Sequence, residues 1–378
     1  MVRESLDKVI FQNFNDPPWP LFVKPFNDES FSSWLLRLSR NHLLRFYSFC
    51  STYFIGVECW NRDLDKFLPE EIKKVILKKT ILQDFEVSNM LLSSYYSKVY
   101  ITELMDRSFW FTPISIYQNS RSHKTSLSIC PNCLSTDGDS PYFRKQWRLS
   151  FYTVCDTCGK DLIDCCPNCD STINYLIIEK GRKGQIPIFP ITCCWKCFFD
   201  LRDSPTVSSS NDQLQMQRTL KEAVDQGYDL SHNVQYSHLY FLVLKKMISL
   251  LNKKNIPQLI KLQEEICKQT DLVFIDPKNG RSFPFELMSV EERRNLTYKA
   301  YWLLNDWPNR FRETTSKVGL RSKNFHDDFP EIPYWLSTEL INNRLVYSEW
   351  RRFYPEYAYG SFKELSYWKI SKMNNGQS

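Results

Sequence analysis

Four C-x-x-C pairs stand near the middle of the chain: CPNC at residues 130–133, CDTC at 155–158, CPNC at 166–169 and CWKC at 194–197. A C-x-x-C turn holds two thiolates on one side of a tight loop, and two such turns complete the tetrahedron of sulfur ligands that Zn²⁺ prefers. The first two pairs enclose 21 residues and the last two enclose 24. These gaps are hairpin-sized and close to those of four-cysteine zinc sites. The spacing therefore predicts two zinc centres in tandem.

Eight cysteines are the predicted metal ligands. The first set is Cys130, Cys133, Cys155 and Cys158, and the second is Cys166, Cys169, Cys194 and Cys197. Cys165 and Cys193 each directly precede a predicted ligand, which leaves open a register shifted by one residue. Cys166 and Cys194 are favoured because each begins a regular C-x-x-C. Four protein thiolates leave no open position for water or substrate, so we expect both centres to be structural rather than catalytic.

Other uses of these cysteines are disfavoured. Structural disulfides need an oxidising compartment, but the first residues, MVRESLDKVIFQ, carry charge where a signal peptide would have its apolar core. Four C-x-x-C copies in paired spacing have no place in a single thioredoxin-like redox site. No run of eighteen apolar residues occurs, which argues against a transmembrane helix. We therefore expect a cytoplasmic protein that does not enter a membrane.

The charge balance bears on nucleic-acid binding. The chain has 49 basic and 43 acidic residues, a formal net charge of +6. Each Zn²⁺ with four thiolates would carry about −2, so two centres lower the net charge to about +2. A reader of duplex DNA working alone needs a concentrated basic surface. We therefore expect weak, salt-sensitive and sequence-indifferent DNA binding.

Extended and helical patterns alternate before the first cysteine pair. Residues 17–20, Pro-Pro-Trp-Pro, cannot be helical and predict an extended arm. A helix with Asn27 as its N-cap is expected next, because apolar residues recur there at helical spacing. This apolar face consists of Phe31, Trp34, Leu35 and Leu38. Arg37 and Arg40 lie off it, as expected for a core-packing helix with solvated arginines.

A basic helical pair is expected between the arm and the cysteines. Pro69 opens one helix, and a second is predicted from Val87 to Tyr100. The pair predicts either a helix-turn-helix or a packed hairpin with a wet basic face, and both interpretations stay open. The candidate nucleic-acid-binding residues are Lys73, Lys74, Lys78 and Lys79, with Lys180, Arg182 and Lys183 after the third cysteine pair.

Helical signals return after the last cysteine pair. Leu239 to Leu251 is apolar almost all round, which predicts a buried core helix. Ser289-Val290-Glu291-Glu292 is a capping box that starts a helix ended by Pro308. The expected class is mainly α with small β zinc ribbons. Its parts are an extended arm (1–24), an N-terminal helix-turn-helix-like domain (25–120), a tandem zinc-binding module (121–200), a linker (201–215), a helical C-terminal domain (216–371) and a tail (372–378).

The stretch PFNDESFSSWLLRL at residues 25–38 resembles the opening motif of the TniQ family, the targeting subunits of heteromeric bacterial transposons. The resemblance continues through CPNCL at 130–134, PYFRKQWRL at 141–149, and Cys155 and Cys158 with Leu162. Family members often carry His where this chain has Cys158. Because Cys and His are both good zinc ligands, the swap should change affinity more than geometry. Residues 303–336 also resemble TniQ C-terminal regions, and a second helix-turn-helix is expected there.

The resemblance implies an adaptor rather than an enzyme. TniQ-like proteins connect a target-recognition component to TnsC, an AAA+ ATPase that recruits the transposase. Some members dock on CRISPR Cascade with its guide RNA, and TnsD-like members read an attachment-site duplex themselves. The length and low effective charge favour docking on Cascade. An unrelated zinc-ribbon transcription regulator is the rival, and homodimerisation stays open.

Catalytic signatures are missing from the sequence, which has no P-loop, no G-x-S-x-G and no H-E-x-x-H. We therefore expect no enzymatic activity. Arginine and tryptophan recur as interface anchors, so the family motifs supply the candidate partner-binding residues. These are Asp28, Trp34, Arg37, Arg144, Trp147 and Arg148. The alternative, in which Trp147 fills the core and the arginines pair with acids, stays open.

Overall fold

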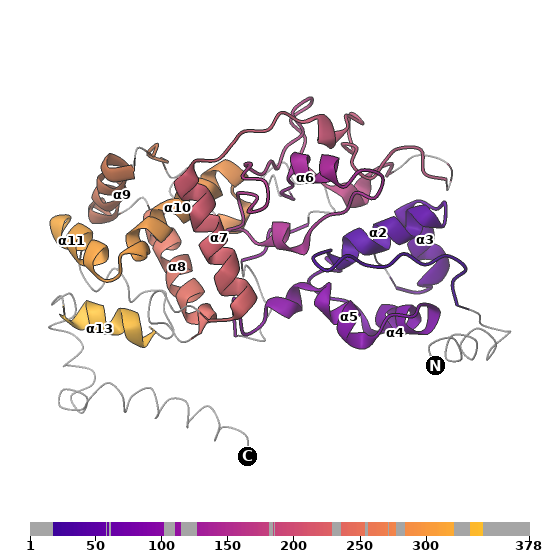
Figure 1. The fold of residues 1–378 in the computed structure, drawn as a ribbon, viewed down its shortest axis with the longest axis horizontal. Helices are drawn as coiled ribbons and strands as arrows, with labels where there is room; N and C mark the ends of the chain where they lie inside the picture. Colours follow the sequence, from indigo (N-terminus) through magenta and orange to yellow (C-terminus); the bar gives the residue numbers. More distant parts are fainter. Residues whose placement is uncertain are drawn as a thin grey trace, which may run out of the picture. The chain divides into compact units, whose positions relative to one another are not determined.

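A computed structural model describes most of the chain (Figure 1). The described residues are 18–57, 59, 62–101, 110–114, 127–180, 184, 186–228, 236–253, 256–270, 272–276, 284–320 and 333–342. Most of the predicted arm, Arg182, Lys183 and the predicted tail lie outside them. The described part is mainly helical, as predicted, and its β structure consists of isolated bridges. None of its helices combines the length and the apolar character needed to cross a membrane.

The chain divides into two compact units. Unit 1 comprises residues 1–96, 102–221 and 284–294, and unit 2 comprises 97–101, 222–283 and 295–378. Unit 1 thus contains both the predicted N-terminal helices and all four cysteine pairs. Its α-helices are α2 (Phe31–Asn41), α3 (Phe46–Tyr53), α4 (Glu70–Lys79), α5 (Asp84–Asn89) and α6 (Pro131–Thr136), followed by the start of α7 (Asn211–Gln226).

Helix α2 forms the core of the N-terminal part, as its apolar spacing predicts. Phe31, Trp34, Leu35 and Leu38 are all fully buried. The predicted N-cap at Asn27 is wrong, because the cap is Ser30, whose hydroxyl accepts a hydrogen bond from the Ser33 N–H at 3.3 Å. Trp19 of the arm packs edge-on against Phe49 of α3, with ring centroids 5.3 Å apart.

The predicted helix over residues 87–100 is also wrong. In its place stand the six-residue α5 and a short 3-10 helix, Leu92–Tyr95. The backbone leaves the helical path because the Leu92 N–H donates to the Asp65 carbonyl at 2.8 Å. Ser97 then adopts a positive φ of 64°, a conformation that L-residues rarely take. α4 does begin after Pro69, as predicted.

Unit 2 is helical where it is described. Its helices are α8 (Ser237–Leu251), α9 (Pro257–Thr270), most of α10 (Val290–Asn305), α11 (Asn309–Lys317) and α13 (Tyr334–Asn342). α8 coincides with the predicted buried helix. The predicted capping box is present at the start of α10, where Ser289 and Glu292 exchange hydrogen bonds of 3.1 and 3.2 Å. The predicted linker is shorter than expected, because α7 already begins at Asn211.

Candidate metal centres and the buried polar network

The last three C-x-x-C pairs share one backbone conformation. The residue directly after each pair has a positive φ of 54° to 65° and donates its N–H to the carbonyl of the first cysteine at 2.9 to 3.0 Å. The first cysteine in turn donates its N–H to the carbonyl two residues beyond the pair, at 2.8 to 2.9 Å. The positive-φ residues are Gly159, Asp170 and Phe198. These paired hydrogen bonds fold each turn so that its two thiols lie close together, in the same sulfur cluster.

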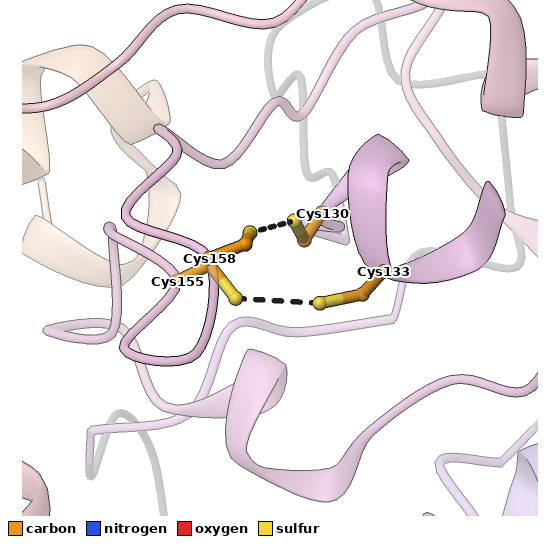
Figure 2. A group of neighbouring side chains, drawn as sticks. All are labelled: Cys130, Cys133, Cys155 and Cys158. Carbon is orange, nitrogen blue, oxygen red and sulfur yellow. Dashed lines mark hydrogen bonds between the residues drawn. The ribbon is translucent and has the colours of Figure 1, made fainter. Parts of the chain in front are cut away.

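The first pair is held differently, by helix α6. Cys130 is the N-cap of α6, and Pro131 occupies the first helical position, where its missing N–H costs no hydrogen bond. Cys133 lies one turn further along. Figure 2 shows both side chains directed from α6 toward Cys155 and Cys158 on the facing loop. A helix start and a tight turn thus supply the two halves of one sulfur cluster.

The sulfur atoms form two clusters, each of which can hold a metal ion. The first sulfur group is Cys130, Cys133, Cys155 and Cys158, and the second is Cys166, Cys169, Cys194 and Cys197. Sulfur–sulfur distances between facing turns are 3.4 Å and 3.4 Å in the first group and 3.6 Å and 3.8 Å in the second. Zn–S bonds of about 2.3 Å in a tetrahedron put sulfurs about 3.8 Å apart. A disulfide would bring them to about 2.05 Å. The spacing therefore fits a tetrahedral metal, and the grouping uses Cys166 and Cys194 rather than their preceding cysteines.

The thiols of the first sulfur group cannot all ionise without a cation. Hydrogen bonding to Cys133 and Cys155, together with burial, raises the pKa of the Cys130 thiol well above its ordinary value. Hydrogen bonds from Cys130 and Cys133 lower the pKa of the Cys155 thiol well below its ordinary value. Four neighbouring thiolates in a partly buried site would repel one another. A divalent cation removes this conflict, because it stabilises all four thiolates and releases their protons.

A buried ion pair lies within the motif at residues 25–38. Glu29 is fully buried and accepts hydrogen bonds from the Arg37 guanidinium at 2.6 Å and the Ser33 hydroxyl at 2.8 Å. Burial raises the pKa of Glu29 to about 7, although Arg37 and Ser33 pull it the other way. Arg40 binds Glu179 at 2.8 Å. Neither arginine of α2 is the solvated residue that the sequence suggested.

A second network joins the motif to the cysteine segment. The Arg148 guanidinium, whose side chain is 3% exposed, binds Asp65 at 2.7 Å and also binds Asp63. Its other donors bind the Thr112 carbonyl at 2.8 and 3.2 Å. Asp65 also accepts from the N–H and hydroxyl of Ser32 on α2, at 2.7 and 2.8 Å. Burial alone would lower the pKa of Arg148, but the two carboxylates outweigh it and raise that pKa.

Arg144 links α6 to the N-terminal segment. It binds Asp137, the C-cap of α6, through two hydrogen bonds of 2.9 and 2.7 Å. Its guanidinium lies over the Tyr142 ring at 4.3 Å, and that ring stacks on Phe26 at 4.2 Å. The Tyr142 hydroxyl donates to Asp28 at 2.9 Å. The first sulfur group and residues 26–33 are therefore parts of one packed body.

Comparison with known families adds a direct finding. The TniQ family model matches residues 20–158. Residues 20–158 therefore form a TniQ domain. The TniQ match begins in the predicted arm and ends at the last cysteine of the first sulfur group. It contains α2, the Glu29–Arg37 pair and the contacts of Arg148 with Asp63 and Asp65. The second sulfur group lies beyond it. No curated protein matches the chain. A TniQ domain implies a targeting protein associated with transposition.

The predicted partner-binding residues fall into three sets. Trp34, Trp147 and Arg148 are at most 2% exposed, so they build the interior and offer no surface. This outcome corrects their assignment as contact residues. Arg37 and Arg144 pair with Glu29 and Asp137, and their side chains are 12% and 13% exposed. Asp28 keeps 43% of its side chain exposed and lies at the surface of the TniQ domain.

The predicted nucleic-acid-binding residues are only partly brought together. Lys73 pairs with Asp84 of α5 at 2.6 Å, whereas Lys74 and Lys78 are exposed on α4 and Lys79 is half-buried. Lys180 is exposed after the third cysteine pair. Arg182 and Lys183 lie outside the described residues. DNA contact by these residues stays a prediction.

Two acidic residues and one arginine of the buried polar contacts were not predicted from the sequence. Asp63 and Asp65 belong to no recognisable sequence motif. Their role is visible only from their contacts with the buried Arg148. Arg293, at the start of α10, is 1% exposed and donates to the Ser150 carbonyl and the Ser128 hydroxyl, both at 2.6 Å. The capping box was visible in the sequence, but nothing there indicates that this first turn packs on the cysteine segment.

Proposed function

We propose that this TniQ-family protein is a target-selection adaptor. It links a target-recognition complex, CRISPR Cascade with its guide RNA, to a TnsC-type AAA+ ATPase and through it to the transposase. The protein contributes no catalysis in this proposal, because a metal held by four thiolates has no open position for a substrate. The metal in both centres is Zn²⁺, since sulfur spacing near that of a zinc tetrahedron comes with a ligand set made only of thiolates.

One observation carries the preference for a protein partner over DNA. The arginines of the family motifs are engaged internally: Arg37 with Glu29, Arg144 with Asp137, and Arg148 with Asp63 and Asp65. Sequence-specific reading needs cations that can reach phosphates and base edges. Cations already neutralised by buried acids do not supply that contact. The TniQ domain therefore fits docking on proteins better than duplex reading.

The contact with the TnsC-type ATPase is proposed to involve the N-terminal rim, defined as Phe26, Asp28 and Tyr142. Phe26 is 37% exposed and Asp28 is 43% exposed at its side chain. An aromatic ring beside a carboxylate is suited to a partner that presents an apolar residue next to a basic one. The buried networks beneath the rim keep its backbone in place. Target DNA near the insertion site adds only a weak, non-specific contact.

A pull-down with the TnsC-type ATPase tests this proposal. The full-length double variant Phe26→Ser with Asp28→Lys should lose capture while it remains folded at the assay temperature, with a lowered melting temperature because both side chains contact Tyr142. The matched control is Phe85→Ser, which removes a ring that is 64% exposed on α5, away from the rim in sequence. It should keep capture. Full capture by the double variant would refute the rim as the contact surface.

A further inference from the structure

The hydroxyl of Ser171, which is not one of the four cysteine ligands, lies against the second sulfur group. Ser171 lies directly after Asp170, the positive-φ residue of the third C-x-x-C turn. Its Oγ is 3.1 Å from the Cys169 sulfur and 3.2 Å from the Cys194 sulfur. These two cysteines come from different turns. The hydroxyl therefore spans the gap between the two halves of the group.

The backbone of Ser171 contacts a third ligand residue. The Cys166 N–H donates to the Ser171 carbonyl at 2.9 Å, the hydrogen bond that closes this turn. Ser171 is only 8% exposed, so its hydroxyl has little competition from water. Hydrogen bonds in such surroundings are electrostatically stronger than in water. One small residue thus engages three of the four cysteines.

The corresponding positions of the other two turns carry different chemistry. Lys160 follows the Cys155–Cys158 turn and directs its ammonium to the Ser208 hydroxyl at 2.8 Å. Phe199 follows the Cys194–Cys197 turn and has no polar side-chain atom. The backbone pattern is the same at all three places. The turn conformation therefore does not require a hydroxyl, and the role of Ser171 lies in its side chain.

We propose that Ser171 is a positioning residue of the second metal centre. With a metal bound, its single O–H donates one hydrogen bond shared between the thiolates of Cys169 and Cys194, offsets part of their negative charge and holds the two turns at ligand distance. Hydrogen bonds to metal ligands typically alter metal affinity 10- to 100-fold when they are removed. Ser171 thus sets the affinity of this centre separately from that of the first.

Chelator competition on the zinc-loaded, full-length protein tests this role. In Ser171→Ala, one of two zinc ions should pass to a colorimetric chelator at a concentration about 10- to 100-fold lower than in the unaltered protein. The other ion should be released as before. Ser171→Thr keeps the hydroxyl and should restore tight binding. Lys160→Ala, at the matching position of the first sulfur group, should change neither ion.

A spectroscopic readout separates positioning from folding. The cadmium-loaded protein should give two ¹¹³Cd resonances, and Ser171→Ala should move one of them while thermal melting in saturating metal stays unchanged. Release of both ions at the unaltered chelator concentration, with unmoved resonances, would overturn the proposal. A single resonance in the unaltered protein would also overturn it, by removing the second centre itself. Neither result would affect capture of the ATPase through the N-terminal rim.

Discussion

Replacing Arg148 by methionine should destabilise unit 1 more than any surface substitution. The guanidinium is 3% exposed, and its carboxylate partners Asp65 and Asp63 are 0% and 19% exposed at their side chains. Methionine fills a similar space but leaves two carboxylates without their cation. Removing one partner of a buried ion pair costs about 3–5 kcal/mol. Such a loss would raise the open fraction of this region by on the order of a hundredfold or more.

Hydrogen exchange measured by mass spectrometry on zinc-saturated protein is the appropriate assay, because the two units need not unfold together. Amides of α2 should lose protection in Arg148→Met, since Asp65 anchors the start of that helix through Ser32. The matched control is Arg202→Met. Arg202 binds Asp200 in a pair whose side chains are 33% and 21% exposed, so its loss should cost less than about 1 kcal/mol. Equal protection of α2 in both variants would refute the reasoning.

Three further outcomes are expected. Elemental analysis should return two zinc ions per chain. Cys130→Ser should lose metal and have a lower melting temperature, because structural zinc supplies folding free energy, whereas Cys165→Ser should keep both ions. Burial raises the pKa of Glu29 to about 7 from an ordinary 4.5, so between these values the folded state holds a proton that the unfolded state has lost, and stability should fall as pH rises toward 7. Glu29→Gln should flatten that slope in denaturation curves measured between pH 5 and 7, and an unchanged slope would count against it. Lowering the pH should weaken zinc binding, because protons compete for the thiolates, and chelator titrations at pH 6 and 8 that coincide would contradict this.

Local patterns in the sequence predicted the sulfur groups well. A C-x-x-C turn is closed by hydrogen bonds among neighbouring residues, so its geometry is contained in a few consecutive positions. The same holds for the apolar face of α2 and the capping box at Ser289. Each of these features depends on residues within about one or two helical turns of one another.

Ion pairs between residues far apart in the sequence could not be predicted. Arg148 meets Asp65 across 83 positions, and Arg40 meets Glu179 across 139. Without those acids in view, an arginine on a helix surface looks solvated or available to a partner. The expected helix over 87–100 failed for the same reason, since the Leu92 N–H is drawn to the distant Asp65 carbonyl. Tertiary hydrogen bonds there outweigh local helix propensity.

The central claim is that target specificity reaches this protein through a partner. The most direct measurement is a gel-shift titration of the isolated protein at physiological salt, with candidate attachment-site duplexes and scrambled duplexes of equal length, repeated with the guide-RNA complex added. The account predicts weak binding without preference for the isolated protein, binding that falls further with added salt, and a preference only when the guide complex is present. Nanomolar preference of the isolated protein for one duplex would contradict it and identify a TnsD-like reader of DNA.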